Sequence, residues 1–179
     1  VQAQEWLDKN YPKEKRNAIK ELIFSNKNLT GELDLSDFVN LKKIDSQSNQ
    51  LTSLVLPSSS TEQLTFLNIN NNNFLEQDLS FLKDLVNLKR LDLRNNKLKG
   101  SLEPLKNMNK LKHLDIGNTD IDSGLEYLPD SLRDFDCSAE TKDAKCKTIY
   151  DLFANEKGEV ETDECGEIKN FSQRLYDYR

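Results

Sequence analysis

The sequence is poor in the residues on which most catalytic and metal-binding sites depend. It has 179 residues but only one histidine, three cysteines and six glycines. Phosphate-binding glycine loops, dinucleotide-binding glycine motifs and nucleophile elbows are missing from it. His113, the one histidine, has no cysteine near it in sequence, and a metal site needs several ligands. We therefore expect no enzyme, no cofactor and no metal site.

An excess of positive charge and long apolar runs are missing as well. The formal net charge is -6 and the isoelectric point is about 5.0, which argues against nucleic acid or an anionic membrane surface as a partner. The apolar runs are only a few residues long, so no segment is predicted to span a bilayer. No signal segment follows Val1, and we expect a cytoplasmic protein.

The cysteines are few and unevenly spaced: Cys137, Cys146 and Cys165. An odd number without paired cysteines at the chain ends favours reduced thiols, as in the cytosol. A disulfide between Cys146 and Cys165 is the alternative that the sequence leaves open.

What the chain does contain is an internal repeat. The pattern L-x-x-L-x-L-x-x-N-x-L begins six times, at Ile19, Leu41, Leu64, Leu88, Leu111 and, in a degenerate copy, Leu132. The starts are 22, 23, 24, 23 and 21 residues apart. Apolar residues and asparagine thus recur at fixed offsets, which is typical of a solenoid built from one repeated unit.

The wording of these copies, above all LNINNNNF at 67–74 and LDLRNNKL at 91–98, resembles leucine-rich-repeat proteins. The resemblance covers residues 19–137, and more loosely the chain is similar to the expanded leucine-rich-repeat proteins of arbuscular-mycorrhizal fungi. It implies an α/β fold: a right-handed solenoid with a curved parallel sheet on its concave face. Short 3₁₀, helical or extended segments would form the convex face, with a polar loop at 58–61. It also implies a non-catalytic protein that binds other proteins.

The alternation of side chains along a strand predicts which residues form the core. The fourth and sixth repeat positions should point inward, and the asparagine at the ninth position should bond the backbone of the bend. We expect a helical N-terminal cap at 1–18 with Trp6 and Leu7 available for burial, repeats at 19–141, and a C-terminal cap at 142–179. In that cap 145–155 and 166–178 are predicted to be helical, with apolar residues at helical spacing: Ile149, Leu152, Phe153, Ile168, Phe171, Leu175 and Tyr176.

The outward positions of neighbouring strands should form columns on the concave sheet. The second position gives a basic column and the fifth a largely acidic one, which as a solvated surface would simply compensate each other. Phe66 is a large apolar side chain in the third column, between Lys43 and Arg90. Aromatic and arginine side chains dominate interface energetics. The predicted binding residues are Phe66, Arg90, Arg94, His113, Lys43, Asn68, Asp92 and Asp115, with Ile23 as a second exposed apolar candidate.

The favoured hypothesis is a monomeric module that binds a protein or peptide on the concave sheet. One alternative is a regulatory or targeting domain of a larger signalling protein. Another is an extracellular receptor ectodomain, which paired cysteines in both caps would favour.

Overall fold

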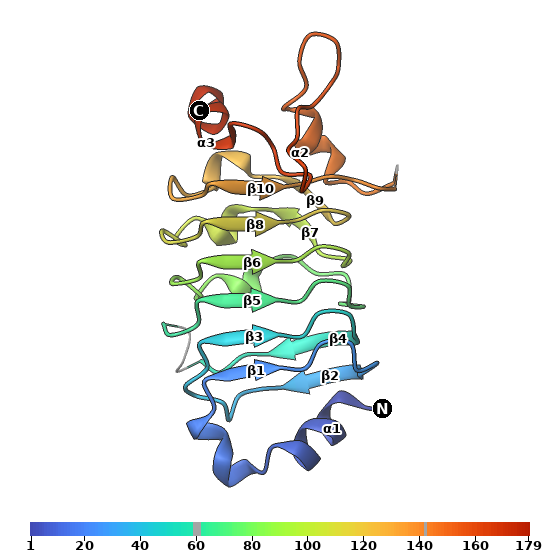
Figure 1. The fold of residues 1–179 in the computed structure, drawn as a ribbon, viewed down its shortest axis with the longest axis vertical. Helices are drawn as coiled ribbons and strands as arrows, with labels where there is room; N and C mark the ends of the chain where they lie inside the picture. Colours follow the sequence, from blue (N-terminus) through green and yellow to red (C-terminus); the bar gives the residue numbers. More distant parts are fainter. Residues whose placement is uncertain (59–61, 142) are drawn as a thin grey trace.

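The computed structural model describes residues 1–58, 62–141 and 143–179 as a column of stacked chain turns (Figure 1). Within these ranges six short strands form one parallel sheet, in the order β1-β3-β5-β6-β8-β10. They are β1 (Glu21–Ile23), β3 (Lys43–Asp45), β5 (Phe66–Asn68), β6 (Arg90–Asp92), β8 (His113–Asp115) and β10 (Asp134–Asp136). The predicted stacked parallel sheet is confirmed.

The register of the sheet places like repeat positions side by side. Leu67 pairs with Leu91, and Leu91 with Leu114. One turn cannot cover its own leucines, so each turn buries those of its neighbours and a continuous core results. The predicted inward pairs are all buried: Leu22 and Phe24, Leu67 and Ile69, Leu91 and Leu93, Leu114 and Ile116.

The side of the column away from this sheet has short extended and 3₁₀ segments, as predicted. Strand β2 (Thr30–Asp34) pairs with β4 (Gln50–Val55), and β7 (Lys99–Ser101) with β9 (Asp120–Ser123). Single 3₁₀ turns follow at Ser80–Leu82, Glu103–Leu105 and Leu125–Tyr127. Residues 59–61 of the predicted polar loop lie outside the described residues.

Asparagine side chains at the ninth position bond the backbone inside the column. The Asn72 amide donates to the carbonyl oxygens of Ser46 and Ile69, at 3.1 and 3.0 Å, and its oxygen accepts the Leu51 N–H at 3.0 Å. Asn49 and Asn96 make the corresponding bonds one turn before and one turn after. Each amide thus joins two consecutive turns and satisfies backbone groups that are shut off from water. The predicted role of these asparagines is confirmed.

The N-terminal end of the column is covered by α1 (Ala3–Asn10) and a 3₁₀ helix at Lys13–Ala18. Leu7 is fully buried, and the Trp6 ring packs 5.7 Å from that of Phe24, centroid to centroid. Arg16 is also buried, which the sequence did not indicate. Its guanidinium donates to an Asp8 carboxylate oxygen and to the Tyr11 carbonyl oxygen, both at 2.7 Å, so it holds the cap together.

The C-terminal end is covered by α2 (Lys147–Asp151), α3 (Phe171–Tyr178) and the chain between them. Both helices are shorter than predicted. Gly166 and Asn170 have left-handed backbone conformations, with φ of 86° and 57°, which a helix cannot include, so α3 begins only at Phe171.

Five of the seven apolar residues predicted at helical spacing in this cap are buried. Phe171 and Phe153 pack against Phe135 of the last strand, with ring centroids 4.9 and 6.3 Å away. Leu152 and Tyr176 are instead 53% and 77% exposed. Tyr176 lies within α3 directly after the buried Leu175, so it points to another side of the helix. Their prediction as core was wrong.

The three thiols are unpaired in the structure. Cys137 and Cys146 are buried and Cys165 is exposed, so the alternative disulfide between Cys146 and Cys165 is not formed. Among the described residues, no helix has the length and apolar character needed to cross a membrane.

Candidate functional site on the strand face

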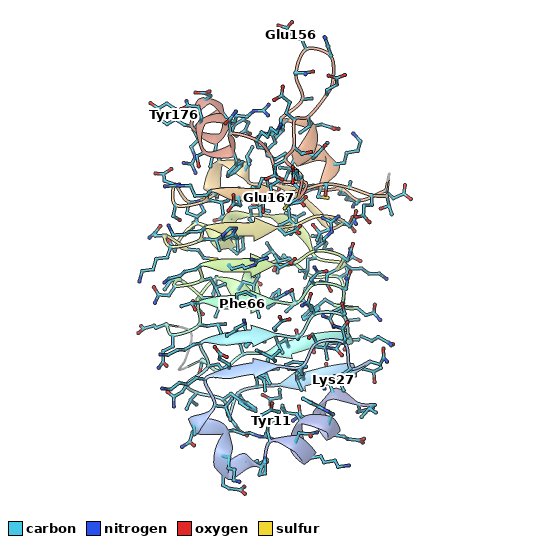
Figure 2. All side chains as sticks on the ribbon, in the orientation of Figure 1. Tyr11, Lys27, Phe66, Glu156, Glu167 and Tyr176 are labelled. Atoms are coloured by element: carbon cyan, nitrogen blue, oxygen red, sulfur yellow. The ribbon has the colours of Figure 1, made fainter. Side chains whose placement is uncertain are left out.

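The outward surface of the six-stranded sheet, here called the strand face, carries the predicted binding residues. The third repeat positions lie side by side across it, in the order Glu21, Lys43, Phe66, Arg90, His113 and Asp134. Phe66 lies near the middle of this row (Figure 2). Because the strands pair in parallel and in register, residues at the same repeat position form a row in which neighbours lie about one strand spacing apart.

The Phe66 ring lies between two cations. The Lys43 ammonium nitrogen is 4.5 Å from the ring centroid and the Arg90 guanidinium carbon is 5.8 Å away, which is the range of cation–π attraction. Neither cation forms an ion pair with another residue in the described ranges. We call Lys43, Phe66 and Arg90 the aromatic patch. It is partly open to solvent, and its two cations are not held in an ion pair within the described ranges.

The fifth repeat position has a structural role at the end of each strand. Its side-chain oxygen accepts the backbone N–H two residues further on, at 2.8 to 3.3 Å, in five consecutive turns. Asp and Asn favour this local turn, which explains the recurring acids. The acceptors are Asp45, Asn68, Asp92, Asp115 and Asp136. Asn68, Asp92 and Asp136 are buried, so this column is not the freely solvated stripe that the sequence suggested.

Burial makes two of these residues, Asp92 and Asp115, reluctant to ionise. It raises the pKa of Asp92 above its ordinary value. For Asp115 burial and then the negative charges of Asp136 and Asp92 raise the pKa to about 7, against the opposing hydrogen bond from the Gly117 N–H.

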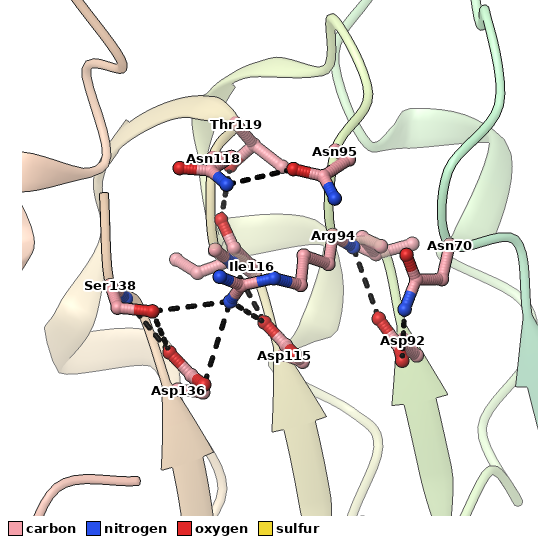
Figure 3. A network of polar contacts seen from close by, with 12 residues as sticks. Asn70, Asp92, Arg94, Asn95, Asp115, Ile116, Asn118, Thr119, Asp136 and Ser138 are labelled. Atoms are coloured by element: carbon pink, nitrogen blue, oxygen red, sulfur yellow. Dashed lines mark hydrogen bonds and ion pairs between the residues drawn. The ribbon is translucent and has the colours of Figure 1, made fainter. Parts of the chain in front are cut away.

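Arg94 offsets this accumulated negative charge (Figure 3). Its guanidinium lies 3.5 Å from carboxylate oxygens of both Asp115 and Asp136, and 2.7 Å from one of Glu140. It also donates to the Ser138 hydroxyl at 3.1 Å. Arg94 thus reaches from its own turn across the next two. We call Arg94, Asp115, Asp136, Ser138 and Glu140 the arginine network.

Gly117 provides the space in which the arginine lies. It occupies the seventh position of the turn that Arg94 crosses, and a Cβ added there would overlap the guanidinium. A side chain at this position would therefore force Arg94 out of the network.

His113 lies at the C-terminal end of the face and has partners from distant segments. Its Nδ1 is 2.7 Å from a carboxylate oxygen of Asp134. Glu167, from the chain between α2 and α3, completes a group whose ligand atoms all lie within 4.8 Å of one another. Burial and the charges of Asp134 and Asp163 raise the pKa of Glu167 to about 7. Asp134 and Glu167 line an open cavity of about 880 Å³.

The structure divides the eight predicted binding residues into separate groups. Lys43, Phe66 and Arg90 contact one another in the aromatic patch, and Arg94 and Asp115 belong to the arginine network. Asn68 and Asp92 are buried at the ends of their strands, and His113 pairs with Asp134. Ile23 is 48% exposed, so the N-terminal cap does not shield it.

Sequence reasoning missed the partners of Arg94 and His113. Asp134 occupies the third repeat position, as Phe66 and His113 do, so the repeat register could have predicted that it lies beside His113. Glu167 had no such signal, because its position depends on how the cap folds back over the last strand.

Comparisons with known proteins agree with this architecture. Residues 63–85 match the family model "Leucine Rich Repeat", and residues 86–139 match "Leucine Rich repeats (2 copies)". No curated protein matches the chain. Together with the stacked sheet, these matches show that the chain is a leucine-rich-repeat solenoid.

Solved structures with a similar fold include receptor ectodomains. The leucine-rich-repeat ectodomain of the receptor kinase SOBIR1 from Arabidopsis thaliana is 31% identical over 56% of this chain and 57% of that one, with a TM-score of 0.50. The plant peptide hormone receptor RGFR1, in complex with RGF2, gives a TM-score of 0.58 at 20% identity, over 72% of this chain and 22% of the receptor chain. The GASSHO1/SCHENGEN3 ectodomain from Arabidopsis thaliana, in complex with CASPARIAN STRIP INTEGRITY FACTOR 2, gives 0.53 at 22% identity, over 72% and 19%. This chain therefore spans little more than half of the first structure and about a fifth of the other two.

Proposed function

We propose that the protein is a non-catalytic binding module that captures a protein or peptide on its strand face. The observation that carries this proposal is the aromatic patch. Phe66 offers a large apolar surface near the middle of a rigid sheet, and Lys43 and Arg90 on either side have no acidic partner of their own among the described residues. Aromatic and arginine side chains near the centre of an interface contribute most of its binding free energy.

The chemistry of the patch favours a particular kind of partner. An apolar side chain packs against the Phe66 ring, and a neighbouring carboxylate reaches Lys43 or Arg90 without displacing an existing ion pair. The remaining predicted residues form the rest of the surface, where their hydrogen bonds hold the strands in shape. The proposed partner is therefore an extended segment that carries acidic residues beside an apolar one.

Proteins with this fold include receptors that were solved together with a bound partner. The structures of RGFR1 with RGF2 and of GASSHO1/SCHENGEN3 with CASPARIAN STRIP INTEGRITY FACTOR 2 are complexes, although their likeness to this chain concerns the fold alone. They support the proposal of a binding module without naming a partner for this chain.

Selection from a displayed peptide library tests this proposal. We expect the enriched peptides to combine acidic and apolar residues, and the double variant Phe66→Ala with Arg90→Ala to weaken their binding at least about 30-fold, the equivalent of about 2 kcal/mol. Tyr127→Ala with Lys110→Ala, an exposed aromatic residue and an exposed cation that both lie outside the strands of the six-stranded sheet, is the matched control. Selected peptides that bind both double variants as tightly as the wild-type chain would refute the proposal.

We also propose that the chain works as a monomer in a reducing compartment such as the cytoplasm. The unpaired thiols support this location, since an oxidising compartment favours disulfides. Measuring the mass of the protein isolated from its native cells, with and without reductant, tests it. A difference that corresponds to a disulfide would contradict the proposal.

A further inference from the structure

His113, Asp134 and Glu167 converge from three segments that are far apart in the sequence. His113 belongs to β8, Asp134 to β10, and Glu167 to the chain before α3, and all three ligand atoms lie within 4.8 Å of one another. Figure 2 shows Glu167 beside the last strand, at the C-terminal end of the strand face. This cluster plays no part in the aromatic patch.

Backbone hydrogen bonds and strand pairing hold the main chain of all three residues in place. His113 and Asp134 are direct neighbours in the parallel register of β8 and β10. On the cap side the Ile168 N–H donates to the Phe135 carbonyl oxygen at 2.9 Å, and the Glu167 N–H donates to an Asp163 carboxylate oxygen at 3.0 Å. The buried Ile168 side chain anchors the same segment. The three ligands are therefore held together without any bound ion.

Within the described residues, no lysine or arginine forms an ion pair with the cluster. Three basic residues line the same cavity (Arg133, Lys169 and Arg174), yet none forms an ion pair with Asp134 or Glu167 among the described residues. The guanidinium of Arg133 donates instead to the carbonyl oxygens of Asp130 and Leu132, and that of Arg174 to the Phe153 carbonyl oxygen. Two carboxyl groups thus lie beside an imidazole nitrogen, and the nearby basic side chains donate to backbone carbonyl oxygens or form no ion pair with these carboxyl groups in the described ranges.

We propose that His113, Asp134 and Glu167 bind a divalent transition-metal ion, and that Zn²⁺ fits them best. One imidazole nitrogen and two carboxylate oxygens form a donor set of intermediate hardness, which suits Zn²⁺ and its first-row neighbours. Mg²⁺ and Ca²⁺ prefer oxygen ligands throughout, and a soft ion such as Cu⁺ prefers thiolates. To bind the ion, the three atoms would have to lie roughly 2.0–2.2 Å from it.

The ion would fasten the C-terminal cap to the last two strands of the sheet. Three protein ligands would leave a fourth tetrahedral position for water, and two of the three residues, Asp134 and Glu167, line the open cavity. Because the ion binds only when the cap lies against β8 and β10, binding it stabilises the folded end of the column.

Calorimetric titration with zinc chloride at 25 °C tests the proposal. The protein is first freed of metal with a chelator and carries Cys165→Ser, so that the exposed thiol cannot contribute a ligand. We expect one ion per chain, a Kd raised at least tenfold by Glu167→Gln or by His113→Gln, and a Kd unchanged by Glu159→Gln. Glu159 lines the same cavity but does not belong to the cluster. Magnesium chloride should bind at least tenfold more weakly than zinc chloride.

A second measurement reports on the cap itself. Zinc should raise the Tm of the Cys165→Ser protein and slow amide hydrogen exchange across residues 162–168, and neither effect should occur in the Glu167→Gln variant. No heat of binding, or equal affinity in the Glu167→Gln and His113→Gln variants, would overturn the proposal. Peptide capture by the aromatic patch should survive removal of the metal, so that failure of either proposal leaves the other standing.

Discussion

In the first half of the column (residues 19–98), asparagine amides inside the column join each turn to the next. In the second half (residues 99–140), the side chain of Arg94 joins turns on the outer surface of the sheet. Asn49, Asn72 and Asn96 bond backbone groups of two turns each. Thr119 follows at the same position in the next turn, and its hydroxyl bonds the backbone of its own turn alone in the described structure. From there on Arg94 reaches over two turns.

The two halves therefore differ in what their outward side chains do: some are available for binding and others stabilise the fold. In the first half the bonds of the ninth-position asparagines lie within the column, and the aromatic patch on the surface takes no part in them. In the second half the surface side chains themselves provide the bonds between turns. We therefore expect changes at the arginine network to reduce stability and changes at the aromatic patch to reduce binding.

The largest effect on stability should come from the asparagines. Asn72→Ala leaves the Leu51 N–H and the Ser46 and Ile69 carbonyl oxygens without their partner, and should lower the free energy of unfolding by about 3 kcal/mol. Thr119→Val removes bonds within one turn only, and should cost about 1 kcal/mol. Urea denaturation measures both. Equal losses would contradict the difference between the two halves.

The next largest difference in stability should be between alanine variants of two arginines on the same face. Arg94→Ala leaves the carboxylates of Asp115 and Asp136 without their cation, and should lower the free energy of unfolding by about 2 kcal/mol. Arg90→Ala should stay within about 0.5 kcal/mol of the wild-type value, because it is exposed and has no ion pair in the described ranges. Urea denaturation measures both variants. A larger loss of stability in Arg90→Ala than in Arg94→Ala would contradict this prediction.

Gly117→Ala should act through Arg94. The new methyl group displaces the guanidinium, so stability should fall by about 1 kcal/mol in the wild-type background and hardly at all when Arg94 is already alanine. A double-mutant cycle measures this coupling. A loss of the same size in both backgrounds would show that the methyl group disturbs the backbone instead.

The smallest effect should be a change in pH dependence. The folded-state pKa of Asp115 is raised to about 7 from an ordinary 3.8, so its contribution to stability is fully present below pH 3.8 and is lost as the pH rises through 7. Asp115→Asn removes this loss. A shift of this size corresponds in full to roughly 4 kcal/mol. Solvent screens most of it at the partly exposed carboxylate, so the variant should gain stability relative to the wild-type chain by about 1 kcal/mol between pH 4 and pH 8. Unfolding in the presence of a chelator, measured across this range, checks it. A gain that falls with rising pH would contradict the raised pKa.

Much of the fold could be predicted because the same residue types recur at the same positions of each leucine-rich repeat. The fixed offsets of Leu67, Leu91 and Leu114 determine which residues face inward and, through the parallel register, which ones lie side by side. The row through Lys43, Phe66 and Arg90 follows from the same rule. Repetition thus makes contacts across the sheet readable from the sequence.

The remainder depends on contacts that no repeat offset encodes. Arg94 lies flat because Gly117 has no side chain, and Glu167 approaches His113 because the cap folds back along β10. The two helices of the cap were predicted too long; for α3 the reason is that the left-handed residues Gly166 and Asn170 interrupt an otherwise apolar periodicity. Such effects arise from tertiary packing.

One comparison of affinities tests the central claim most directly, namely that the strand face has a binding region and a stabilising region. For a peptide selected on the wild-type chain, Kd should rise at least about 30-fold in the double variant Phe66→Ala with Arg90→Ala. It should change by less than about threefold, under 1 kcal/mol, in Arg94→Ala at a temperature where that variant is folded. The reverse order, with Arg94→Ala abolishing binding and the double variant retaining it, would contradict the account.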